Sequence, residues 1–289
     1  AELRYQGVPL LKAYSDTFVN LFKGRGDLER KENARLLGVG FDGLIGDVTA
    51  RFGSQDSVPG AMAKLQQRFF KLNLMSWWND TNRTSAALIM SNNLANKVDL
   101  QHSQLGKAAN VMQQYDIGEV EWNLYRKHAV KEAADGNKYM VSEAIEDLDD
   151  ATIKQYLKDK GNAKPSARDI SMARDELVSR LDTYFQDRSD YAVPMPGAAE
   201  RAIMSQGTEV GTVEGEVIRL IMQFKAFPIT MIRRGLGREV YGAADGKPDM
   251  MGLVHLIAGT TLFGYASMVA KDVLKGKEPR TFTGDTEKD

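Results

Sequence analysis

Apolar side chains recur every three or four positions through most of the chain, which is the spacing of one face of an α-helix. The stretches between them are rich in glycine, proline, asparagine and aspartate, the residues typical of turns. No repeat and no convincing alternating strand is present, so the pattern predicts an all-α fold of roughly eight to ten helices without a significant sheet. The predicted helices cover residues 10–23, 27–52, 59–78, 86–94, 100–115, 118–134, 150–160, 170–185 and 212–241.

The most distinctive stretch is Met250–Ala270, which contains no Asp, Glu, Lys or Arg and has His255 as its only ionisable side chain. A helix of about 20 apolar residues can cross a hydrocarbon core of roughly 30 Å. A helix that is apolar all round can equally lie at the centre of a soluble helical core. The pattern alone leaves both interpretations open.

A stripe of small and polar residues runs along this predicted helix. Gly252, His255 and Gly259 line one side, and Gly264 and Ser267 continue the stripe one row over. Small residues let two helices approach closely, both in membranes and in soluble cores, whereas a plain lipid anchor does not need them. We therefore interpret the stretch first as a helix that packs against other helices and can meet a bilayer, with a permanent anchor as the less favoured alternative.

Several helix ends carry signals in the sequence. Ser166 and Asp169 have the spacing of a capping box, in which a hydroxyl and a carboxylate accept each other's backbone N–H. Asp149 or Asp150 is expected to cap the helix that stops at Gly161. These signals predict where two of the helices begin and where one ends.

Three short polar stretches interrupt the helical pattern. Asn79–Asn82 is either a break or a polar patch within one long helix. Residues 135–137 (Asp-Gly-Asn) predict a turn. Tyr139–Val141 is the only segment that we expect to be extended.

The helical pattern divides into two regions and a tail. We predict an N-terminal helical region at 1–189, a C-terminal helical region at 190–277 and a flexible polar tail at 278–289. The sequence begins without Met and without a basic-then-apolar signal pattern. We expect it to be a piece of a longer polypeptide.

Composition excludes several functions. The chain has 289 residues, a formal net charge of −1 and no cysteine. The balanced charge argues against a dedicated nucleic-acid coat, which would carry a strong positive excess. The lack of cysteine excludes disulfides, thiolate catalysis and cysteine-based metal sites.

One glycine-rich stretch imitates a nucleotide-binding motif. Residues 38–43 match G-x-G-x-x-G, but they lie inside a helical apolar pattern, and residues 61–63 supply no acid at the expected distance. Gly40, Gly43 and Gly46 are better explained as a face on which another helix packs closely. We predict no cofactor.

The histidines give no sign of a metal site. His102, His128 and His255 are far apart in the sequence and lack the short spacings of metal ligands. Val120, Leu124 and His128 share one face of the predicted helix 118–134. We therefore expect ordinary hydrogen-bonded histidines and no metal.

A cluster of acids is the one candidate for catalysis. A carboxylate pair could cleave glycosides if one acid were buried and the second stood at a fixed separation. The five acids crowd one short polar stretch and look solvated, with one of them a helix cap. They are Glu143, Glu146, Asp147, Asp149 and Asp150.

The segment Val217–Arg238 predicts a basic amphipathic helix, with an apolar arc opposite Arg219, Arg233 and Arg234. Helices of this kind can lie on anionic bilayers, so the three arginines are candidates for contact with lipid or phosphate. A core helix with a solvated basic edge is the alternative that we prefer on frequency.

Two blocks of the sequence resemble a known class of proteins. Gln223–Gly242 (QFKAFPITMIRRGLGREVYG), followed by a glycine-rich apolar helix, resembles the C-terminal part of very large internal virion, or DNA-ejection, proteins of short-tailed bacteriophages and of related prophage polyvalent proteins. Arg35–Phe52 resembles their helical segments. Neither block is a catalytic motif, so no functional residue carries over.

The resemblance implies a structural, non-enzymatic piece of an ejection apparatus that forms a conduit for DNA. Implied partners are copies of the chain, other virion or ejection proteins, double-stranded DNA passing without sequence specificity, and the host inner membrane. The implied location is the virion and later the host envelope. A peptidoglycan-cleaving enzyme and a soluble helical interaction domain with a buried 250–270 helix stay as alternatives.

Overall fold

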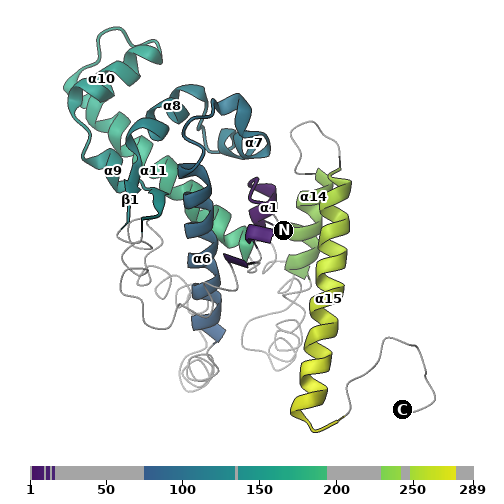
Figure 1. Cartoon of the computed structure of the whole chain (residues 1–289). Coiled ribbons are helices and arrows are strands. Elements are labelled where there is room, and N and C mark those ends of the chain that lie inside the picture. The colour runs from purple at the N-terminus through teal and green to yellow at the C-terminus, as the bar shows by residue number, and fades with distance from the viewer. Residues whose placement is uncertain are drawn as a thin grey trace, which may run out of the picture. The chain divides into compact units, whose positions relative to one another are not determined.

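The computed structural model describes residues 2–9, 11–13, 15–16, 75–133, 136–193, 229–241 and 248–277, with the backbone alone at 75–80 and 241. The described residues belong to two compact units, a larger one within residues 2–234 and a smaller one formed mainly by residues 235–289. Both are mostly helical, as predicted (Figure 1). The predicted helix 27–52 and the motif at 38–43 lie outside the described residues, and the boundary predicted between residues 189 and 190 stays a prediction.

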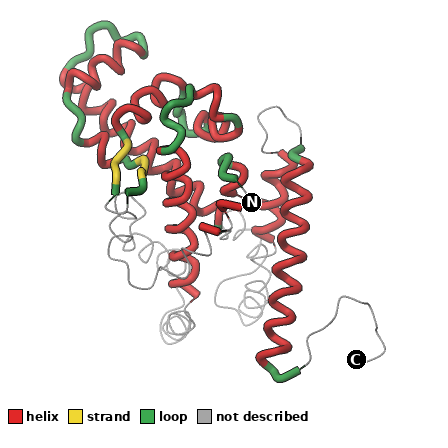
Figure 2. The backbone as a smooth tube through the Cα atoms, viewed as in Figure 1, coloured by secondary structure: helices red, strands yellow, loops and turns green. Residues whose placement is uncertain are grey.

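The larger unit consists of helices and one small hairpin (Figure 2). In chain order it contains α1 (Glu2–Tyr5), α6 (Met75–Ala95), the 3₁₀ helix η1 (His102–Leu105), α7 (Lys107–Gln113), α8 (Glu119–His128), β1 (Val130–Glu132), β2 (Lys138–Met140), α9 (Glu143–Glu146), α10 (Asp150–Asp159) and α11 (Ala167–Ala192).

The core of the larger unit lies where α11 packs against α6 and where α8, α9 and α10 add their apolar faces. Trp122, Tyr125, Tyr184 and Phe185 are fully buried there. Burial of a large apolar side chain stabilises a fold by about 1.5–3 kcal/mol. The indole N–H of Trp122 donates to the Leu100 carbonyl at 2.9 Å, so its polar atom is satisfied as well.

The described part of the chain contains one small sheet, and its second strand overlaps Tyr139–Val141, the segment predicted to be extended. Strands β1 and β2 form an antiparallel hairpin in which Val130 pairs with Met140. The helix predicted over 118–134 ends at His128. The chain continues as β1, turns through Gly136, whose φ of +77° suits glycine, and returns as β2. The hydroxyl of Ser91 on α6 donates to the Met140 carbonyl at 2.8 Å, an anchor from a distant helix that sequence periodicity does not reveal.

Two other helices differ in detail from the prediction. The helix predicted over 100–115 is divided at Gly106, which has a φ of +63°. The face predicted for α8 is wrong at His128, which is exposed, whereas Trp122 and Tyr125 face the core. The stretch Asn79–Asn82 is not a break, because α6 continues through it.

The predicted caps are confirmed. The Ser166 hydroxyl accepts from the Asp169 N–H at 3.2 Å, and the Asp169 carboxylate accepts from the Ser166 N–H at 2.8 Å. Asp149 caps α10 by accepting from the Thr152 N–H, and Gly161 follows the end of that helix with a φ of +96°. Side-chain caps of this kind satisfy backbone donors that a helix leaves unpaired.

The smaller unit is built on two helices that lie side by side (Figure 1). The π-helical segment η2 (Met231–Leu236), most of which belongs to the larger unit, leads into α14 (Gly237–Tyr241), and α15 (Met250–Leu274) returns along α14. The helix predicted over 212–241 is therefore helical in its described part, while its bend at Pro228 lies outside the described residues. Asp249 joins the two helices: its N–H donates to the Glu239 carbonyl at 2.7 Å, and its carboxylate accepts from the Gly252 N–H at 3.0 Å.

Candidate functional site

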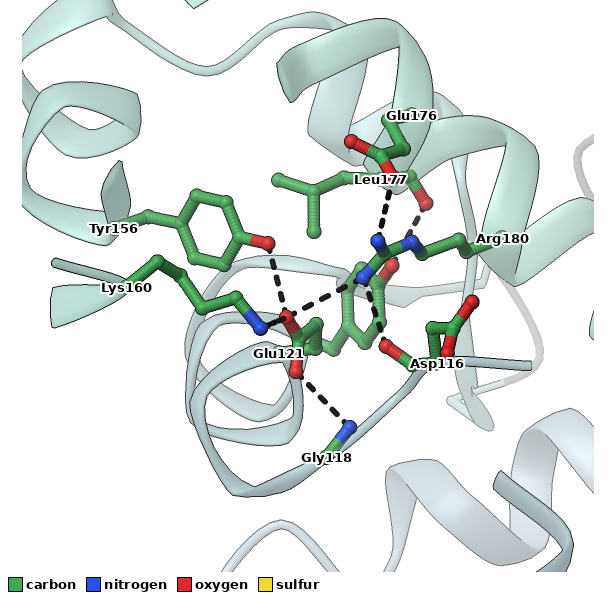
Figure 3. A network of polar contacts seen from close by, with 9 residues as sticks. Asp116, Gly118, Glu121, Tyr156, Lys160, Glu176, Leu177 and Arg180 are labelled. Carbon is green, nitrogen blue, oxygen red and sulfur yellow. Dashed lines mark hydrogen bonds and ion pairs between the residues drawn. The ribbon is translucent and has the colours of Figure 1, made fainter. Parts of the chain in front are cut away.

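A polar network connects α8, α10 and α11 around the carboxylate of Glu121, which is only 2% exposed (Figure 3). One oxygen accepts from the Tyr156 hydroxyl at 2.9 Å and from the Lys160 ammonium at 2.7 Å. The other oxygen accepts from the backbone N–H of Gly118 at 3.0 Å. Tyr156 and Lys160 come from α10 and its C-cap, and Gly118 is the N-cap of α8, so this one carboxylate ties α10 to the start of α8.

Arg180 extends the network from α11. Its guanidinium lies 3.4 Å from Glu121, donates to the Asp116 carbonyl at 2.8 Å and donates to Glu176 at 2.5 Å (Figure 3). Next to it the Tyr125 hydroxyl donates to the Leu177 carbonyl at 2.7 Å. The charged groups therefore neutralise one another within the unit.

The network fixes the protonation of its members. Burial alone would raise the pKa of Glu121, but hydrogen bonds from Lys160, the backbone and Tyr156 hold that pKa below its usual range. Burial, and then the neighbouring charge of Glu121, raise the pKa of Tyr156. At neutral pH Glu121 is thus an ion with no proton to give, and Tyr156 keeps its proton.

An open hollow of about 440 Å³ lies over this network, lined by Gln113, Asp116, Gly118, Glu121, Lys160 and Arg180. Its acids and bases already pair with each other, and the carboxylate of Glu121 accepts from four donors. A network whose groups are paired in this way fits a structural role better than a catalytic one.

A second buried cluster joins α1 to α11. The guanidinium of Arg188 donates twice to one oxygen of Glu2, at 2.9 and 2.7 Å, although the side chains are only 5% and 2% exposed. Gln6 donates to the same oxygen at 2.8 Å, and Tyr184 donates to Gln6 at 2.8 Å. Burial alone would lower the pKa of Arg188, but the charge of Glu2 and nearby groups raise it, so Arg188 stays charged.

The acids singled out from the sequence lie on the surface. Glu143 pairs with Lys131 at 3.1 Å, and Asp150 pairs with Arg174 at 2.7 Å. Asp149 is the cap of α10. The cluster therefore consists mainly of exposed ion pairs and a helix cap.

Sequence reasoning missed one carboxyl in this region. Burial raises the pKa of Asp182 on α11, the charge of Glu146 adds to the rise, and a hydrogen bond from Ser142 opposes it. Asp182 follows Leu181 at the edge of the apolar pattern, so periodicity placed it in the solvent and gave no signal of its burial.

The three histidines have different environments. His102 is buried, His128 is exposed, and His255 is half-buried with its Nδ1 2.6 Å from the Met251 carbonyl oxygen. Among the described residues, no three histidine or acidic side chains cluster as metal ligands would.

The helix α15 differs from every site above, because most of its apolar surface is exposed in the part of the chain that the structure describes. It is long and apolar enough to cross a membrane, and only 6% of its most apolar window is buried. Its exposed large apolar residues are Met250, Met251, Val254, Ile257, Leu262, Phe263, Met268, Val273 and Leu274. In the part of the chain that the structure describes, α15 is therefore not the centre of a core, and the soluble interaction domain stays an alternative.

The predicted stripe of α15 is partly covered. Gly252 is buried, His255 and Gly259 are half-buried, and Gly264 and Ser267 are exposed. The Ser267 hydroxyl donates to the Phe263 carbonyl of its own helix at 2.8 Å, and the Thr260 hydroxyl donates to the Leu256 carbonyl at 2.8 Å. The N-terminal end of the stripe therefore packs within the unit, and the remainder faces outward.

The arginines that are candidates for contact with lipid or phosphate have different environments. Arg233 is exposed, and the guanidinium of Arg234 lies 5.4 Å from the ring centroid of Tyr191. Arg219 lies outside the described residues. At the far end of α15, Lys271, Lys275 and Lys277 are exposed.

Comparison with known proteins adds no relative: no family model, no curated protein and no solved structure matches the chain.

Proposed function

We propose that this chain is a structural component of a bacteriophage DNA-ejection apparatus, and that α15 enters the host inner membrane when the apparatus assembles there. Its partners are copies of itself, other ejection proteins and the passing double-stranded DNA. The basis for the phage assignment is the resemblance of Gln223–Gly242 and Arg35–Phe52 to internal virion proteins. The near-neutral charge suits a conduit, which should not hold DNA tightly.

The observation that carries the membrane part of the proposal is the exposure of α15. Met251, Ile257 and Phe263 are 61%, 59% and 44% exposed, and at 3.6 residues per turn they point in three directions about 120° apart. A helix that lies on a bilayer has one polar face. A helix apolar all round has to be covered on every side, which lipid does.

Two further features favour lipid over a soluble partner. Exposed hydroxyls on α15 donate to carbonyls of their own helix, so they need no outside acceptor in hydrocarbon. Three exposed lysines, Lys271, Lys275 and Lys277, follow the apolar run. Lysines at this position are suited to contact the phosphates of anionic lipids.

Localisation tests the proposal as a whole. Purified phage particles and the envelope fraction of cells that have adsorbed them are probed with an antibody against the chain. We expect the chain in the particles and, after adsorption, in the envelope. Absence from particles would contradict the phage assignment.

The half-buried Asp182 favours a second candidate, an enzyme that cleaves peptidoglycan. Its raised pKa beside the charge of Glu146 is the environment that separates an acid from a base in glycoside cleavage. Zymography decides between the two candidates. Clearing by the full chain that is lost in Glu146→Gln and Asp182→Asn, but kept in Glu143→Gln, would favour the enzyme, and no clearing would favour the structural role.

A further inference from the structure

We propose that α14 and α15 form a hairpin that is closed in water and opens when α15 enters a bilayer. This inference rests on the membrane part of the proposed function. It concerns how the helix is kept before insertion and what must change for insertion to occur.

The first argument is length. The uncharged run Met250–Ala270 is about 32 Å long at 1.5 Å per residue, which matches a hydrocarbon core of roughly 30 Å. In the closed hairpin α14 packs against α15 (Figure 1), and the buried residues of α15 are Gly252 and Leu256 in its first turns and Asp272 near its end. The uncharged run that remains beyond Leu256, Ile257–Ala270, is only about 21 Å long. The closed hairpin therefore offers too short a helix to cross a bilayer.

The second argument is charge. If the closed hairpin entered the bilayer as a unit, α14 would take Arg238 and Glu239 into hydrocarbon. These side chains are 8% and 1% exposed, and their ion pair measures 2.8 Å. An ion pair in hydrocarbon costs several kcal/mol more than at the lipid headgroups. We therefore expect α14 to stay at the surface while α15 separates from it.

The third argument is that three polar side chains of α15 would keep their hydrogen bonds when the helix separates from α14. Thr260, Ser267 and the ring of His255 all bond to carbonyls within α15 itself. The segment η2 before α14 is π-helical, and π-helical turns are rare and occur mostly at functional sites. The contact between the two helices can therefore be exchanged for lipid at low cost to hydrogen bonding.

Paired spin labels test the opening. The chain has no cysteine, so Leu236→Cys with Ile257→Cys places two labels within the smaller unit, at positions that are 39% and 59% exposed, one just before α14 and one on α15. Pulsed electron paramagnetic resonance measures their separation in buffer and on floated vesicles of phosphatidylcholine with phosphatidylglycerol. We expect the separation to grow by about 10 Å or more on vesicles, because packed helix axes lie only 8–10 Å apart.

A matched pair within α15 is the control. Ile257→Cys with Leu274→Cys spans one continuous helix, so its separation of about 25 Å along the axis should be the same in both conditions. An unchanged Leu236–Ile257 separation on vesicles that do float would overturn the hairpin inference and leave the membrane function standing. Failure of the chain to float would overturn both.

Discussion

Glu121 and α15 both depart from the rule that charges lie outside and apolar side chains inside, but the chain accommodates them differently. Glu121 is a charge in the interior, and the larger unit surrounds it with the hydroxyl of Tyr156, the ammonium of Lys160 and a backbone N–H. The helix α15 is apolar surface on the exterior, and the chain covers little of it. A buried charge without partners would unfold the unit, so its partners lie within the same chain. Exposed apolar surface is tolerated until an outside partner covers it.

This contrast separates stability from function. Substitutions in the buried networks should change the free energy of unfolding and leave membrane binding alone. Substitutions on the outer face of α15 should do the reverse. The four predictions below test this division from the largest expected effect to the smallest.

Arg188→Ala should lower the free energy of unfolding by about 3–5 kcal/mol, because it leaves the buried carboxylate of Glu2 without its charged partner. Urea unfolding followed by far-ultraviolet circular dichroism measures the loss. In the double variant Glu2→Met with Arg188→Met, no charge is left buried, so it should lose less than Arg188→Ala. A loss below about 1 kcal/mol in the single variant would mean that the pair is dispensable.

Leu262→Arg should weaken binding to vesicles by about 3 kcal/mol, roughly 100-fold, because it places a guanidinium at the middle of the apolar run. Leu262 is 67% exposed, so the same change should leave the free energy of unfolding unaltered. The matched control is Met172→Arg on α11, a residue 58% exposed in the larger unit. Equal binding by the two variants would show that α15 does not enter lipid.

Glu121→Gln should lower the free energy of unfolding by about 2 kcal/mol at neutral pH, because Lys160 and Arg180 lose a charged acceptor. It should also change the response to acid. The pKa of Glu121 is lower in the folded chain than in the unfolded one, so its stabilisation is present above the unfolded pKa of about 4.3 and is lost as pH falls through the folded value.

Unfolding of the wild type and of Glu121→Gln, measured from pH 7 down to pH 3, tests the sign. The wild type should lose more stability on acidification than the variant does. Parallel curves for the two proteins would show that Glu121 does not hold its charge in the way the network implies.

Local signals in the sequence were enough for part of this fold. Ser166 and Asp169 lie three residues apart and bond to each other's backbone as a capping box, so adjacent residues contained the information. In the hairpin, the sequence predicted β2 as extended but missed β1, and it gave no sign that Ser91, 49 positions away, bonds to the Met140 carbonyl. Periodicity reports which face of an element is apolar, and it does not report what a distant residue offers to the backbone.

The candidate sites show the same difference between what neighbouring residues reveal and what depends on distant residues. The apolar run of α15 was visible in the sequence because no charge interrupts it, but its exposure depends on whether other helices cover it, which periodicity cannot show. The Glu121 network was missed because Lys160 and Arg180 come from other helices and look like ordinary surface charges in the sequence. The Glu2–Arg188 pair joins residues 186 positions apart.

Gly264→Ala should stabilise α15 in water by about 1 kcal/mol, because glycine is a poor helix former and a Cβ at this position would meet nothing within 4 Å. Thermal unfolding followed by circular dichroism measures this gain. If Gly264→Ala is more stable in water but its copies no longer associate on vesicles, the outer part of the stripe forms helix contacts in the membrane. A loss of stability in water would contradict the exposure of Gly264.

The most direct test of the account is the depth of α15 in a bilayer. Single spin labels at Met251→Cys, Leu262→Cys and Leu274→Cys occupy positions 61%, 67% and 87% exposed along one helix. Their accessibility to oxygen and to a water-soluble nickel complex is measured on floated vesicles. The account predicts that the label at Leu262 lies deepest and that the labels at both ends lie near the headgroups. Equal depths for all three labels, or labels that all stay in water, would contradict it.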